Sequence, residues 1–141
     1  MTMHAHKISL GIFLVVTHFG ILLSIFAFWI KGGFLFDEMI TALGLIAPLF
    51  AGYSTVIFAY ITDHQRGTPP PEPVTVSYRV TSFFVALMFA VVVGGAVVLW
   101  AYKIGFTDFE QFKIVVGLLE GLFGVYVGQF IYSMFPKMVT Q

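Results

Sequence analysis

The sequence predicts an all-α integral membrane protein with four transmembrane helices, and three observations support this fold class. The chain has 141 residues, of which 59% are hydrophobic and only 10% are charged, whereas a soluble domain is about one quarter charged. Four segments reach the roughly 20 apolar residues that a helix needs to cross a bilayer. These segments are continuously apolar rather than alternating, which favours helices over the strands of a membrane barrel.

The four predicted spans cover residues 8–30, 39–62, 80–102 and 114–135 and form a single transmembrane domain over 1–141. The first span is longer than a signal-peptide core, so we expect it to be retained. An even number of spans places both termini on the same side. Four of the seven Lys and Arg residues fall on that side, which favours cytoplasmic termini of a multi-pass protein in the inner or plasma membrane.

A proline-rich cytoplasmic linker, 63–79, joins the second and third predicted spans and contains the run GTPPPEP. Consecutive prolines favour an extended polyproline II conformation and exclude helix. We interpret the linker as a stiff spacer between two helical hairpins. The alternative is a docking strip for a partner that recognises proline.

An internal repeat is indicated when the chain is compared with itself at an offset of 72 residues. The matches gather at the loops that follow the first and third spans: Lys31 with Lys103, Gly33 with Gly105, Phe34 with Phe106 and Glu38 with Glu110. The repeat predicts two tandem helical hairpins in parallel orientation.

Glu120 is the only Asp, Glu, Lys or Arg within the four predicted spans. A charged side chain at the centre of a membrane helix costs about 2.5–3.5 kcal/mol on insertion scales. One hypothesis is therefore a carboxylate that binds an ion, accepts a proton or lines a pore. The alternative is a protonated or hydrogen-bonded glutamate that ties helices together.

His18 is the only histidine within a predicted span. Helical rise places it within about one turn of the depth of Glu120, so the two side chains can meet. A proton relay or a gating pair is one interpretation, and a plain hydrogen bond between helices is the other.

Two more polar candidates lie within the spans. Tyr53 follows Pro48 in the second span, and Gln129 follows Glu120 in the fourth. Their hydroxyl and amide groups suit hydrogen bonds to backbone carbonyls. Pro48 frees a carbonyl of its own helix and favours a kink there, and it is the counterpart of Glu120 at the 72-residue offset.

Four glycines follow one another in the last predicted span at steps of four, three and four: Gly117, Gly121, Gly124 and Gly128. This spacing places them on one helical face. Small residues allow close helix contacts in lipid. We expect the face to serve helix packing, either within one bundle or between subunits.

The composition excludes several classes of function. The chain has no cysteine and a formal net charge of zero, so nothing indicates a disulfide, a thiolate metal site or a nucleic-acid partner. Catalytic and cofactor motifs are absent from the sequence. We therefore expect no enzyme activity, no metal and no cofactor.

The sequence leaves two hypotheses for function. The first is a homo-oligomer, embedded in the lipid bilayer, that forms or gates a permeation path as an ion channel or a membrane-perturbing effector. The alternative is a non-catalytic membrane anchor or accessory subunit that packs against other membrane subunits in a larger complex.

Overall fold

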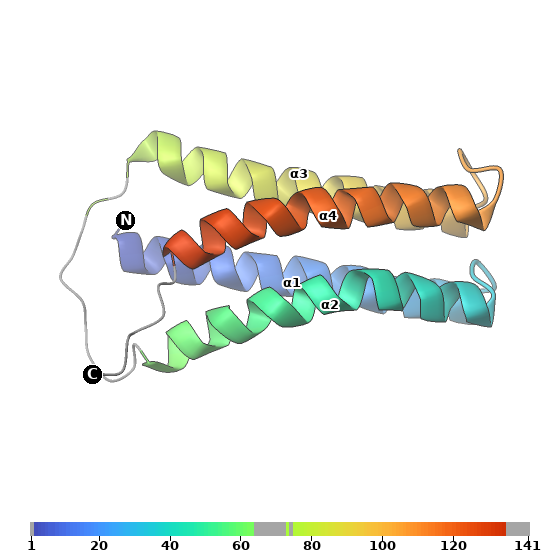
Figure 1. The fold of residues 1–141 in the computed structure, drawn as a ribbon, viewed down its shortest axis with the longest axis horizontal. Coiled ribbons are helices and arrows are strands. Elements are labelled where there is room, and N and C mark those ends of the chain that lie inside the picture. Colours follow the sequence, from blue (N-terminus) through green and yellow to red (C-terminus); the bar gives the residue numbers. More distant parts are fainter. Residues whose placement is uncertain (1, 64–72, 74, 135–141) are drawn as a thin grey trace.

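Four α-helices make up the computed structural model, which describes residues 2–63, 73 and 75–134. They are α1 (Met3–Ile30), α2 (Phe36–Asp63), α3 (Val76–Ala101) and α4 (Phe109–Met134). The helices lie lengthwise beside one another and alternate in direction (Figure 1). We call the end that carries the loops 31–35 and 102–108 the loop end, and the opposite end, where α1 begins, the terminal end. The described residues contain no strand, only an isolated bridge between Thr2 and Pro73.

The helices are arranged so that α1 and α4 lie diagonally opposite each other. Helix α1 packs against α2 and α3, and α4 packs against the same two helices. The parallel helices α1 and α3 are therefore neighbours, as are α2 and α4 (Figure 1). The segment from α2 to α3 joins the other diagonal pair, and most of the predicted proline-rich linker, residues 64–72 and 74, lies outside the described residues.

Each helix begins several residues before the predicted span, because hydropathy detects only the apolar part of a helix. The polar residues ahead of that part stabilise the first turn by accepting hydrogen bonds from free N–H groups. Leu35 N donates to Glu38 Oε2 at 2.9 Å, and Gln111 N donates to Asp108 Oδ1 at 2.9 Å. The predicted linker is accordingly shorter than 63–79, since α2 includes Asp63 and α3 begins at Val76.

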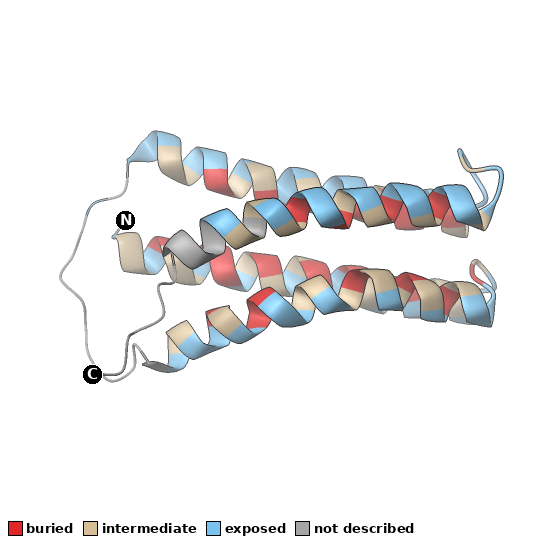
Figure 2. Cartoon of the chain, viewed as in Figure 1, coloured by how far each residue is buried: buried red, intermediate tan, exposed pale blue. Residues whose placement is uncertain are grey.

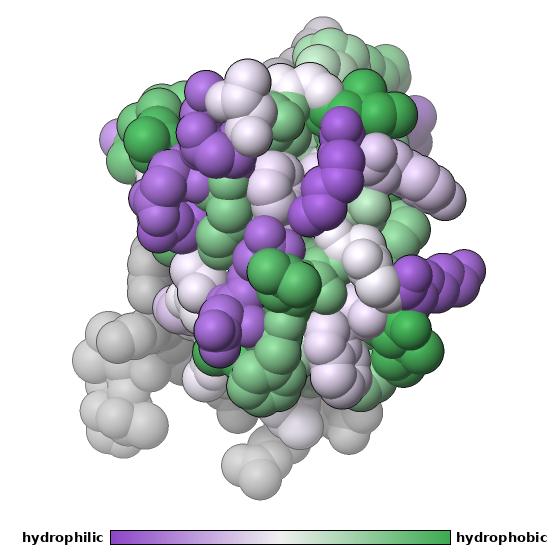
Figure 3. Space-filling model, turned by 90° about the vertical axis from the view of Figure 1, so that its right-hand side faces the viewer, coloured by the Kyte–Doolittle hydropathy of each residue, from purple (hydrophilic) through white to green (hydrophobic). Residues whose placement is uncertain are grey.

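Three helices, α1, α2 and α3, are long and apolar enough to cross a membrane. The outward faces of all four helices are exposed along much of their length (Figure 2), and they carry large apolar side chains such as Val16, Phe58, Val91 and Leu122. Hydrophilic side chains gather at the loop end (Figure 3). The chain therefore has the surface of a membrane protein. The fourth span and the side on which the termini lie stay predictions.

The core consists of two clusters of buried side chains. The loop-end cluster contains Ile21, Ile25, Phe34, Met39, Ala42, Ile46, Val93, Ala96, Val97, Trp100, Phe112 and Val116. The terminal-end cluster contains Leu10, Leu14, Tyr53, Ile57, Ala86 and Phe123. Both clusters lie between the four helices.

The loop end is closed by contacts between α2 and the end of α3. Glu38 Oε2 accepts a hydrogen bond from Trp100 Nε1 at 3.3 Å and lies 3.5 Å from Lys103 Nζ. The same Nζ lies 3.8 Å from the centre of the Trp100 ring, at a distance suited to a cation–π interaction. We call these three side chains the loop-end clamp.

The 72-residue repeat stays a prediction, because hairpins of similar length pack side by side whether or not their sequences repeat. The loops also differ in detail. Glu38 pairs with Lys103 of the other hairpin, whereas Glu110 pairs with Lys113 at 2.6 Å. In the first loop Gly32 has a positive φ of 78°, and in the second Lys103 and Gly105 do, at 57° and 80°.

We expect Gly11→Ala to lower the free energy of unfolding by about 1–3 kcal/mol through overpacking. The added Cβ would lie 2.8 Å from Ile57 Cγ2, and Ile57 is only 1% exposed, so it has no room to move aside. The control is Gly20→Ala, in the same helix, where a Cβ would meet nothing within 4 Å. Equilibrium unfolding in detergent micelles measures both, and equal stability of the two variants would contradict the close α1–α2 contact.

Candidate functional site

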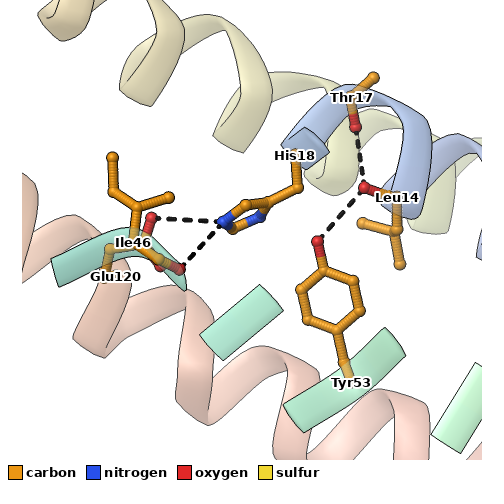
Figure 4. A network of polar contacts seen from close by, with 6 residues as sticks. All are labelled: Leu14, Thr17, His18, Ile46, Tyr53 and Glu120. Atoms are coloured by element: carbon orange, nitrogen blue, oxygen red, sulfur yellow. Dashed lines mark hydrogen bonds and ion pairs between the residues drawn. The ribbon is translucent and has the colours of Figure 1, made fainter. Parts of the chain in front are cut away.

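A histidine and a glutamate from the two diagonally opposite helices meet inside the bundle. His18 of α1 is 2% exposed and Glu120 of α4 is 7% exposed, and His18 Nε2 lies 3.9 Å from Glu120 Oε1 (Figure 4). Because α1 and α4 are not neighbours, both side chains must point toward the axis of the bundle to come this close. We call these two residues the buried pair.

The imidazole of His18 is oriented by a hydrogen bond to α2. His18 Nε2 lies 3.3 Å from the carbonyl oxygen of Ile46. A carbonyl can only accept, so Nε2 carries the hydrogen in this bond. Ile46 lies two residues before Pro48, and α2 changes direction along its length in Figure 1, as expected where proline removes a backbone donor.

Aromatic rings from the other two helices pack against the imidazole. Phe50 of α2 stacks on it with ring centres 5.5 Å apart, and Phe89 of α3 stacks on it at 5.6 Å. The Tyr53 ring meets it edge-on at 5.5 Å. Phe89 stacks in turn on Phe123 of α4. The imidazole is therefore fixed by contacts from neighbouring helices and shielded from the lipid.

The carboxyl group of Glu120, unlike the imidazole of His18, forms no hydrogen bond within the part of the chain that the structure describes. Both of its carboxyl oxygens are buried without a hydrogen-bond partner among the described residues. A charged carboxylate in such a place costs several kcal/mol unless a counter-charge, a proton or water reaches it. The site is thus chemically suited to binding a proton, a small cation or water. No group of three or more metal-binding side chains occurs in the described part of the chain.

Tyr53 extends the polar contacts toward the terminal end. Its hydroxyl donates to the carbonyl oxygen of Leu14 at 3.2 Å, and Thr17 Oγ1 donates to the same oxygen at 3.2 Å (Figure 4). Gln129 and Pro48 do not join the site, because both side chains are exposed on the outer faces of their helices.

The four glycines of α4 are not covered closely by the rest of the described chain. A Cβ added at Gly117, Gly121 or Gly128 would meet nothing within 4 Å, and at Gly124 it would meet only Leu49 Cδ1, at 3.6 Å. The glycine face is therefore open along the bundle. Its role in packing between subunits stays a prediction.

The structure also brings together polar residues that the sequence analysis did not select. His6 Nε2 lies 3.0 Å from Ser82 Oγ, and this hydroxyl donates to the carbonyl oxygen of Arg79 at 3.0 Å. Both His6 and Ser82 are buried, as is Ser54. His6 lies outside the predicted first span, and its burial follows from the start of α1 at Met3. Helical periodicity, extended to the residues before position 8, is the signal that could have predicted the burial of His6.

Comparisons with known protein families, with curated proteins and with solved structures find no match.

We expect His18 and Glu120 to be energetically coupled. In a double-mutant cycle with His18→Leu and Glu120→Gln, the coupling energy should fall in the range of about 0.5–3 kcal/mol found for buried residues in contact. The matched control is Glu110→Gln with Lys113→Gln, an exposed ion pair one turn apart on α4, for which about 0.2–0.5 kcal/mol is usual. Unfolding free energies give both values. A buried pair coupled no more strongly than the control would contradict the site.

Proposed function

We propose that this protein assembles as a homo-oligomer in the membrane and forms or gates a permeation path. The observation that carries this proposal is the carboxyl group of Glu120, which is buried without a hydrogen-bond partner among the described residues and whose Oε1 lies 3.9 Å from His18 Nε2. Acids at this depth are costly and commonly mark ion or proton pathways. In this proposal all four helices span an inner or plasma membrane, with cytoplasmic termini.

The open faces of α2 and α4 support self-association. The glycine face of α4 borders α2, since a Cβ added at Gly124 would lie 3.6 Å from Leu49 Cδ1. Helix α2 adds two glycines, Gly44 and Gly52, at which a Cβ would also meet nothing within 4 Å. Lipid provides no hydrophobic force between helices, so small residues that permit close backbone contact favour association. A second copy would cover these faces.

The packed core supports a gate rather than a path that is always open. The side chains of the buried pair are almost fully enclosed, and Phe50 and Phe89 close the same level of the bundle. A change in the charge of Glu120 changes its attraction to His18 and its need for water. The closed arrangement would then be one of two states, and the ion or proton that Glu120 binds would bias the bundle toward the other.

An accessory subunit is the second candidate. The same open glycine face would serve it equally well, because a helix of a different membrane protein could occupy the face. In that case the buried pair would stabilise the fold, and function would reside in the complex.

Native mass spectrometry of protein extracted from its host membrane separates these candidates. We expect a closed set of identical 15.7 kDa chains. The variant Gly121→Leu should be monomeric with unchanged helix content, because the added side chain blocks the close approach of two helices. The control is Gly20→Leu, which alters an open glycine of α1. Stoichiometric foreign subunits would instead establish the accessory role.

Ion flux into liposomes that contain the purified protein tests the role of Glu120. We expect flux with the parent protein and a loss of at least about tenfold with Glu120→Gln, since the variant keeps the shape of the side chain and removes the group that binds the ion or proton. Glu110→Gln, at an exposed acid of the same helix, should conduct normally. Unchanged flux with Glu120→Gln would remove Glu120 from the mechanism, and no flux with the parent would contradict the permeation path.

A further inference from the structure

Among the side chains that the structure describes, the buried polar ones lie at the middle of the bundle or in its terminal half. They are His6, Ser82, Ser54, His18 and Glu120. His18 and Glu120 lie at the middle, and the other three lie between this level and the terminal end. On the loop side of the buried pair, the described buried side chains are those of the loop-end cluster, which are apolar. The one polar atom among them, Trp100 Nε1, is bonded to Glu38.

The same half of the bundle contains four buried polar atoms that have no hydrogen-bond partner in the described chain. They are His6 Nδ1, Ser54 Oγ and both carboxyl oxygens of Glu120. Buried polar atoms in proteins are nearly always bonded, either to protein or to ordered water. An unbonded one costs about 1–3 kcal/mol. Because hydrocarbon offers no donors or acceptors, water is the partner that fits these atoms.

We infer that water enters the bundle from the terminal end and reaches Glu120, whereas the loop-end half stays dry. The inference rests on the proposed function, in that it takes the bundle to cross a membrane, and it names the side from which solvent and protons reach the buried pair. The result is a hydrated half-path that ends at Glu120.

Polar groups of the protein occur at several levels of this half of the bundle. Near the terminal end, His6 Nε2 meets Ser82 Oγ at 3.0 Å, and the Tyr126 hydroxyl lies 3.5 Å from the carbonyl oxygen of Ser82. From Ser82 to Phe89, which stacks on His18, the helical rise is about 10 Å. On α2, Ser54 follows Tyr53, whose ring contacts that of His18.

The arrangement of the helices also favours the entry of water from the terminal end. Helices α2 and α3 spread apart toward the terminal end, whereas the four helices stay close together at the loop end (Figure 1). At the loop end the clamp ties Glu38 to Trp100 and Lys103. The backbone of Gly33 also packs so tightly there that a Cβ would lie 2.9 Å from the carbonyl oxygen of Ala101.

Cysteine accessibility tests the direction of the half-path, because the natural chain contains no cysteine. Single variants Ser54→Cys and Ser82→Cys probe the terminal half, and Ala42→Cys and Ala96→Cys are controls of similar burial in the loop-end cluster. A charged, membrane-impermeant methanethiosulfonate is added to either side of sealed proteoliposomes of known protein orientation. We expect modification from the terminal side only, about tenfold or more faster at the two serine positions, because the reactive thiolate forms in water.

Three results would overturn the inference: no modification at Ser54→Cys and Ser82→Cys, modification of these positions from the loop side, or equally fast modification of the controls. Hydroxyl-radical footprinting of the parent protein repeats the test without substitutions, since radicals form from water next to the residue they oxidise. Phe123, in the terminal-end cluster, should be oxidised more than Phe112, in the loop-end cluster. Equal protection of both rings would contradict a hydrated half-path.

Neither measurement depends on oligomerisation or ion flux. One-sided labelling of a protein that conducts nothing would uphold the half-path and contradict the permeation proposal. Ion flux without cysteine labelling would support the permeation proposal and contradict the half-path.

Discussion

The meeting of His18 and Glu120 on the axis of the bundle is the constraint on which the remaining arrangement depends. Side chains from diagonal helices can touch only where all four helices approach one another. The two remaining corners of this layer are filled by Phe50 of α2 and Phe89 of α3, which both stack on the imidazole. Each helix thus contributes one side chain to the layer, and the helix order follows from it, with α1 between α2 and α3.

This layer separates two halves of the bundle that are stabilised by different interactions. Toward the loops the helices are held by apolar packing and by the clamp around Glu38. Toward the termini the packing is interrupted by His6, Ser54 and Ser82, and cohesion there relies partly on hydrogen bonds between helices. Such bonds contribute modestly in membranes, on average about 0.6 kcal/mol each. The terminal half is therefore the part of the bundle that local fluctuations open first.

Hydropathy alone predicted the helices and their order along the chain, and the isolation of Glu120 and His18 among apolar residues pointed to the buried pair. It could not predict which helices are neighbours, because a linear pattern contains no information about position around the bundle axis. Gln129 was predicted as a polar site residue in the same span as Glu120, yet nine residues of helix turn it by about half a revolution, to the opposite face. His6 was missed because the apolar span was predicted to begin at residue 8, whereas α1 already begins at Met3.

The loop-end clamp has a mechanical consequence. Glu38, Trp100 and Lys103 join the start of α2 to the end of α3, so these diagonal helices are fixed relative to each other at the loop end. Any change in the angle between them must pivot about that end. A helix of 28 residues is about 42 Å long, so a tilt of about 5° displaces its far end by about 4 Å, roughly the diameter of one water molecule plus its clearance. The clamp thus acts as a pivot that converts a small rotation at the loop end into a molecule-sized displacement at the terminal end.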